Sequence, residues 1–169
     1  MDALKNVTLR VAGVIEESIV DGPGLRFVLF LQGCRTHCKG CQNPQTWDFE
    51  GGTAVSAEDI LNRIQGDPLV HGITFSGGEP FEQAAALVPL AEELKRRGYH
   101  LMAFSGYTFE QLLEKPSCRD LLSLLDLLVD GPFVEEQKSL ELRFRGSRNQ
   151  RILNMAASRN AGWKPVSDR

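Results

Sequence analysis

The feature that most restricts the fold of this sequence is a repeated alternation of short apolar runs with longer amphipathic stretches. A short apolar run bounded by turn residues is typical of a buried strand, and apolar residues three or four positions apart are typical of a helix. Strand followed by helix, repeated four times, favours a parallel sheet with right-handed crossovers. Strands are predicted at 25–32, 71–75, 99–104 and at the end of 119–133. The sequence therefore predicts an α/β fold.

The amphipathic stretches carry signals for the starts and ends of helices. They are predicted over residues 56–64, 81–98, 108–115 and from 119 onward. Ser56 and Thr108 stand where an N-cap side chain is expected, and each has an acidic or amide residue three positions later. Gly98 follows a basic last turn, which is typical of a helix end, and Pro89 should kink the second helix.

The C-terminal part gives weaker signals. Residues 140–145 alternate leucine or phenylalanine with charged residues, which predicts a half-exposed strand, antiparallel or at an edge. Residues 160–169 have weak structure signals and are expected to form a loose tail. No internal repeat or dividing linker interrupts the chain, so we expect a single domain over residues 1–169.

Composition excludes several classes of function. A formal net charge of −3 and a pI near 5.6 give no electrostatic reason to expect a nucleic acid or an anionic membrane as a partner. The N-terminus lacks the apolar core of a secretory signal, and the most apolar stretch, 121–129, is far too short to span a bilayer. We therefore expect a cytoplasmic protein, in which clustered cysteines indicate metal or redox chemistry.

Cys34, Cys38 and Cys41 stand close together after the first predicted strand, whereas Cys118 is distant and is expected to be a buried core thiol. Three thiolates can hold a 4Fe-4S cluster and leave one iron open to a ligand. They can also bind zinc, with His37 as a fourth ligand, or carry no metal. The triplet alone leaves iron–sulfur and zinc level.

A second motif, SGGEP at residues 76–80, follows the second predicted strand. Two glycines allow a ligand to approach the backbone, and Glu79 adds a carboxylate at a helix start. Such a rim suits an ammonium group. A tight strand-to-helix turn that merely requires glycine is, for this motif by itself, the more common explanation.

Taken together and in this order, the two motifs resemble those of the radical S-adenosylmethionine (SAM) superfamily. The resemblance implies a partial, open (β/α) barrel with a mostly parallel sheet, a 4Fe-4S cluster on Cys34, Cys38 and Cys41, and bound SAM. It also implies that Gly77, Gly78 and Glu79 bind the methionine amine. The adenine side would be lined by the backbone of Gly40, Cys41 and Gln42.

The resemblance extends to activating proteins of anaerobic ribonucleoside-triphosphate reductase. Similar blocks are found at 20–34, 38–47, 73–81, 105–112, 128–133 and 144–151. The implied activity is reductive cleavage of SAM to a 5′-deoxyadenosyl radical, which generates a glycyl radical on the large reductase subunit. Flavodoxin or ferredoxin is the expected electron donor.

Three residues in these blocks have open roles. Asp130 could hold the ribose or methionine part of SAM, or could be an ordinary turn or helix-cap residue. Arg148 and Asn149 could serve partner docking or SAM contacts.

Three alternatives remain. The target could be another glycyl-radical enzyme or a small molecule, although a barrel of four units, open on one side, favours a protein loop. The third is a zinc-binding or electron-carrying module, which leaves the glycine motif unexplained.

Overall fold

The computed structural model describes residues 2–34, 44–139, 142 and 144–168, and it contains one sheet in the order β3-β1-β2-β4-β5-β6-β7. Four central strands run parallel, while β1, β3 and β7 pair antiparallel with their neighbours. The strands are β1 (Thr8–Ser18), β2 (Arg26–Leu31), β3 (Thr53–Ser56), β4 (Gly72–Gly77), β5 (His100–Phe104), β6 (Leu127–Asp130) and β7 (Arg151–Asn154). Since β3 and β7 stand at opposite ends of this order, the predicted open, partial barrel with a mostly parallel core is confirmed.

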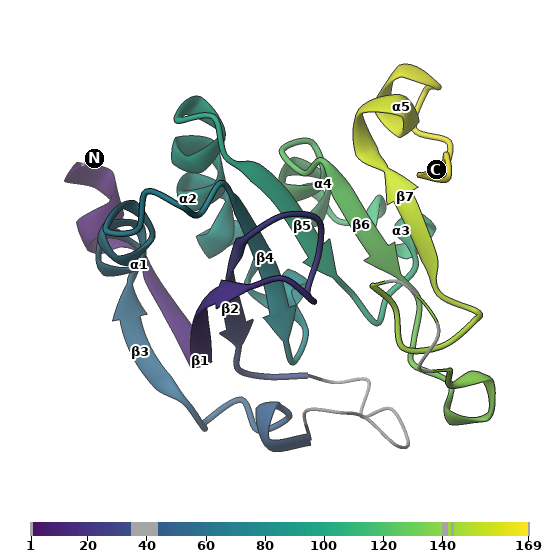
Figure 1. Cartoon of the computed structure of the whole chain (residues 1–169), viewed down its shortest axis with the longest axis horizontal. Coiled ribbons are helices and arrows are strands. Elements are labelled where there is room, and N and C mark those ends of the chain that lie inside the picture. The colour runs from purple at the N-terminus through teal and green to yellow at the C-terminus, as the bar shows by residue number, and fades with distance from the viewer. Residues whose placement is uncertain (1, 35–43, 140–141, 143, 169) are drawn as a thin grey trace.

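The carboxyl ends of β2, β4, β5 and β6 point to one edge of the sheet (Figure 1). The register places Phe30 beside Ser76 and Leu31 beside Gly77. Parallel strands bring the segments that follow them to a common rim, which is where α/β folds carry ligands. The segments after these four strands therefore meet at one place.

Alternate residues of the central strands face two different layers, as the period of two requires. Phe27, Leu29, Ile73, Phe75 and Leu101 belong to the main core with the helices. Burying such side chains stabilises the fold by about 2 kcal/mol each.

A buried charge lies at the amino ends of the parallel strands. Arg26 is 1% exposed and donates to Thr74 Oγ1 at 2.8 Å, to Pro23 O at 2.8 Å and to Ile73 O at 2.9 Å. Burial lowers the pKa of Arg26 to about 10, which leaves it charged at neutral pH. These bonds fix the turn before β2 to the sheet.

The helices confirm most of the predicted signals. They are α1 (Ala57–Gln65), α2 (Ala84–Arg96), α3 (Phe109–Leu112), α4 (Pro116–Leu122) and α5 (Met155–Asn160), with short 3-10 turns at Asp2–Asn6, Pro44–Thr46, Pro80–Gln83 and Glu135–Gln137. Ser56 caps α1, Thr108 forms a capping box with Gln111 on α3, and Gly98, predicted to stand at the end of a helix, follows α2 with a φ of 89°. Pro89 lies inside α2.

The strand predicted over 140–145 is wrong at Leu142, Phe144 and Arg145, the positions of it that the structure describes. Phe144 has a φ of 58°, which an extended strand does not allow. Leu142 and Phe144, which belong to the alternating pattern, line a cavity instead. The antiparallel edge strand in the C-terminal part of the chain is β7, which pairs with β6.

Within residues 160–169, predicted to be a loose tail, Val166, Ser167 and Asp168 are paired with β7. Asn154 N donates to Val166 O at 2.8 Å, and Asp168 N donates to Ile152 O at 2.9 Å. The ring of Trp163 stacks on Phe109 with 6.2 Å between centroids. The bonds to residues 166 and 168 satisfy part of the outer edge of β7.

No helix in the described part of the chain is both long enough and apolar enough to cross a membrane.

Candidate functional site

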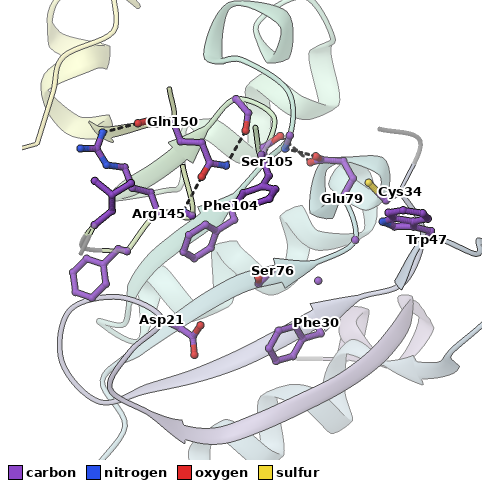
Figure 2. Close-up of a pocket in the computed structure, with 18 of the residues that line it drawn as sticks. Asp21, Phe30, Cys34, Trp47, Ser76, Glu79, Phe104, Ser105, Arg145 and Gln150 are labelled. Atoms are coloured by element: carbon purple, nitrogen blue, oxygen red, sulfur yellow. Dashed lines mark hydrogen bonds between the residues drawn. The ribbon is translucent and has the colours of Figure 1, made fainter. Parts of the chain in front are cut away.

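A cavity of about 410 Å³ opens at the rim where the parallel strands end (Figure 2). Phe30, Ser76 and Phe104, one from each of three neighbouring strands, line it. All three lie near the carboxyl ends of β2, β4 and β5, on the face turned away from the main core. The sheet therefore supplies one wall, and the segments that follow the strands supply the others.

Cys34 enters this cavity three residues after β2 ends, and its side chain is buried. Its position is fixed by the backbone, because Gly33 N donates to Thr46 O at 2.6 Å and Cys34 N donates to Trp47 O at 3.1 Å. Gly33 and Cys34 therefore lie beside Thr46 and Trp47, on the other side of residues 35–43 in the sequence. Residues 35–43, with the predicted ligands Cys38 and Cys41 and the predicted SAM contacts Gly40 and Gln42, lie outside the described residues.

Gly77 and Gly78 line the cavity next to Cys34. A Cβ on Gly77 would lie 2.5 Å from the backbone of Leu31, and one on Gly78 would lie 2.5 Å from Gly33 O. Both contacts are too short for a real side chain, so the packing of this chain against itself is enough to require glycine here. That these glycines also bind the methionine amine stays a prediction.

Glu79 is fully buried and lines the cavity, but three donors of the protein already contact its carboxylate. Gly106 N donates at 2.7 Å, Ser105 Oγ at 2.9 Å and Phe81 N at 3.2 Å. The carboxylate therefore ties the end of β4 to the turn after β5. Burial raises the pKa of Glu79 to about 7, although the three hydrogen bonds oppose the shift.

Asp130 serves the structure of the rim rather than the cavity. Its carboxylate accepts from Phe109 N at 2.7 Å and from Arg151 Nε at 2.9 Å, and Arg151 Nη2 also contacts it. Of the two roles considered, the geometry supports the helix cap. The hydrogen bonds to Asp130 and Glu110 raise the pKa of Arg151 further above its usual value.

The segment that contains Arg148 and Asn149 also shapes the rim. Asn149 Nδ2 donates to Pro132 O at 2.8 Å, which joins this segment to the turn after β6. Arg148 is exposed and its backbone N donates to Gln137 O at 3.0 Å. Neither residue is among those that line the cavity.

Sequence reasoning did not single out Asp21, Ser105 and Arg145, which all line the cavity (Figure 2). The available signal was position, since Ser105 directly follows a strand and Asp21 precedes one across a glycine-rich turn. Cys118 is buried as predicted, with its Sγ 3.7 Å from Phe81 O, and burial raises the pKa of this thiol.

The residues present fit an iron–sulfur cluster at the Cys34 end of the cavity. A thiol at the wall, beside two glycines that keep side chains away, leaves room for a bulky group. Both ends of the cysteine-bearing segment are anchored at this same wall.

Comparison with known proteins agrees with this geometry. Residues 20–153 match the family model described as a 4Fe-4S single cluster domain. The anaerobic ribonucleoside-triphosphate reductase-activating protein of Haemophilus influenzae is 33% identical over 142 residues, which cover 79% of this chain and 90% of that protein. The pyruvate formate-lyase-activating enzyme of Clostridium pasteurianum is 36% identical over 124 residues, covering 70% of this chain and 52% of that enzyme.

Among solved structures, QueE from Escherichia coli shares the fold, with a TM-score of 0.50 at 21% identity, covering 63% of this chain and 56% of that one. The chain therefore belongs to the radical SAM family of activating proteins with a single 4Fe-4S cluster, the family predicted from its cysteine and glycine motifs.

Proposed function

We propose that this chain is an activating protein of anaerobic ribonucleoside-triphosphate reductase, and that it generates a glycyl radical on the large reductase subunit. The observation that carries the proposal is that Cys34 and the Gly77–Glu79 wall line one cavity. The Haemophilus influenzae protein named for this activity matches this chain over 90% of its own length. The pyruvate formate-lyase-activating enzyme matches over 52%, which favours the reductase as the target.

Cys34, Cys38 and Cys41 would hold the cluster, with Gly77 and Gly78 offering backbone carbonyls to the methionine amine. The backbone of Gly40, Cys41 and Gln42 would line the adenine side. When bound, the cluster and SAM supply the one-electron chemistry that removes a hydrogen atom from a glycine Cα.

The chain's own residues would position and enclose the reactants. Glu79 fixes the turn at Ser105 and Gly106, so the second and third strand ends keep their spacing. Phe30 and Phe104 give the cavity an apolar wall, which limits water near a reactive species. No proton transfer by a side chain is required.

The electron donor would be a flavodoxin or ferredoxin, while the net charge of −3 favours neither nucleic acid nor a membrane surface as a partner.

The test is anaerobic reconstitution with iron and sulfide, followed by reduction with dithionite and addition of SAM and the purified reductase. We expect 5′-deoxyadenosine, methionine and a glycyl-radical signal on the reductase in electron paramagnetic resonance. Cys38→Ala should lose all three, and Cys118→Ala, which removes a thiol distant in sequence from the triplet, should keep them. A wild-type chain that binds zinc without iron and cleaves no SAM would refute the proposal.

A further inference from the structure

Arg145 brings a guanidinium to the cavity at the end away from Cys34 and Trp47 (Figure 2). Its Nη1 donates to Gln150 O at 2.7 Å. Its Nε is buried and has no hydrogen-bond partner in the described part of the chain. A guanidinium with an unsatisfied buried donor is costly, so the part of this side chain that lines the cavity is suited to an acceptor that arrives with a ligand.

The backbone around Arg145 is fixed before any ligand binds. Gln150 Oε1 accepts from Gly146 N at 2.9 Å and from Ser147 N at 3.2 Å, and its Nε2 donates to Gly131 O at 3.0 Å. These bonds close the turn and attach it to the end of β6. A donor held in this way loses little freedom when it binds, which favours specific recognition.

The turn before β2 contributes other residues to the same cavity. Val20 and Asp21 line it, and residues Ile19 and Val20 are each 74% exposed. These two neighbouring aliphatic residues, next to a cavity, form an apolar surface that is open to contact by another protein. The cavity therefore lies beside the exposed apolar residues Ile19 and Val20, and the Arg145 side chain provides it with a hydrogen-bond donor that is held in place.

We propose that Arg145 binds a main-chain carbonyl of the glycine-bearing segment of the partner reductase, with Ile19 and Val20 contacting the same partner. This inference rests on the proposed function and names a residue that positions its substrate. Asp21 already places a carboxylate at the cavity, so a neutral carbonyl suits the site better than a further anion. A segment built around glycine presents such carbonyls without side chains in the way.

The test compares Arg145→Met and Arg145→Lys with the control Arg63→Met, which removes an exposed arginine of α1 that does not line the cavity. The probes are the purified reductase and SAM, each titrated against reconstituted protein. For Arg145→Met we expect the Kd for the reductase to rise tenfold or more, roughly the loss of a hydrogen bond to a charged group. The Kd for SAM should change less than twofold, and Arg145→Lys should restore binding only in part, because lysine lacks the planar fork.

Val20→Ser tests the other contact without touching the Arg145 turn, and it should also weaken reductase binding. An unchanged Kd for the reductase in Arg145→Met would overturn the inference. A parallel loss of SAM binding in that variant would also overturn it, by assigning Arg145 to the cofactor. Failure of the proposed function itself is distinguishable, because then the wild-type protein would give no radical on the reductase.

Discussion

Replacing Glu79 by glutamine removes a buried carboxylate while keeping its size, and the result should depend on pH. The side chain is fully buried and accepts hydrogen bonds from Gly106 N, Ser105 Oγ and Phe81 N. A glutamine can accept from Gly106 with its oxygen and donate to the Ser105 hydroxyl with its nitrogen. The N–H of Phe81 then loses its acceptor, which costs about 1–3 kcal/mol at any pH.

The wild-type carboxylate has a cost of its own at higher pH, which partly offsets the stability that the variant loses. Its pKa is raised from 4.5 to about 7 in the folded protein, chiefly by burial. Because the folded pKa is the higher one, its contribution to stability is complete below pH 4.5 and is lost as the pH rises through about 7. Between about pH 5 and about pH 8 this loss amounts to about 2 kcal/mol. Glutamine has no such loss.

We therefore expect Glu79→Gln to be clearly less stable than the wild type near pH 5 and nearly as stable near pH 8. Urea unfolding followed by far-ultraviolet circular dichroism at both pH values measures the two free energies of unfolding. The difference between variant and wild type cancels the titration of all other groups. If that difference is the same at both pH values, the pKa of Glu79 is not raised and the reasoning fails.

Two further substitutions test the rim. Gly78→Ala places a Cβ 2.5 Å from Gly33 O, so we expect a loss of about 1–3 kcal/mol in unfolding free energy and a lower iron content after reconstitution. Gly13→Ala is the control, because a Cβ at Gly13 meets nothing within 4 Å. Equal iron content in the two variants would contradict the steric argument. Asp130→Ala removes the acceptor for Phe109 N at the start of α3 and the buried one of the two carboxylates that contact Arg151, so we expect a loss of about 2 kcal/mol in the free energy of unfolding, measured in urea. SAM cleavage per folded molecule should be retained, and its selective loss would indicate a direct role at the cofactor.

The parallel core was predictable because apolar runs and helix signals alternate regularly, and β2, β4, β5 and β6 all follow that pattern. The antiparallel strands β1, β3 and β7 were not predictable in this way. β1 (Thr8–Ser18) has an irregular burial pattern and two interruptions in its register with β2, so the sequence has no simple period. Leu142 and Phe144 gave a clear period of two that reflects a cavity lining and not a strand.

The site divides in a similar way. Cys34 and the two glycines were identified from local motifs, and the common strand rim explains why Cys34 lies near them. The roles of Glu79 and Asp130 depend on partners 26 and 21 residues away in the sequence, such as Ser105 and Arg151. No local pattern states which distant donor a carboxylate will meet, and that choice decides between binding a ligand and fixing a turn.

The two backbone bonds that join Gly33 to Thr46 and Cys34 to Trp47 have a consequence for how such proteins can vary. Because these bonds hold the two ends together, the sheet does not depend on the number of residues between Cys34 and Thr46. Doubling the length of an insertion whose ends are already joined costs only about 0.6 kcal/mol in closure entropy. The barrel therefore sets no requirement on the spacing of Cys38 and Cys41, which is left to the cluster and the SAM that this segment would hold.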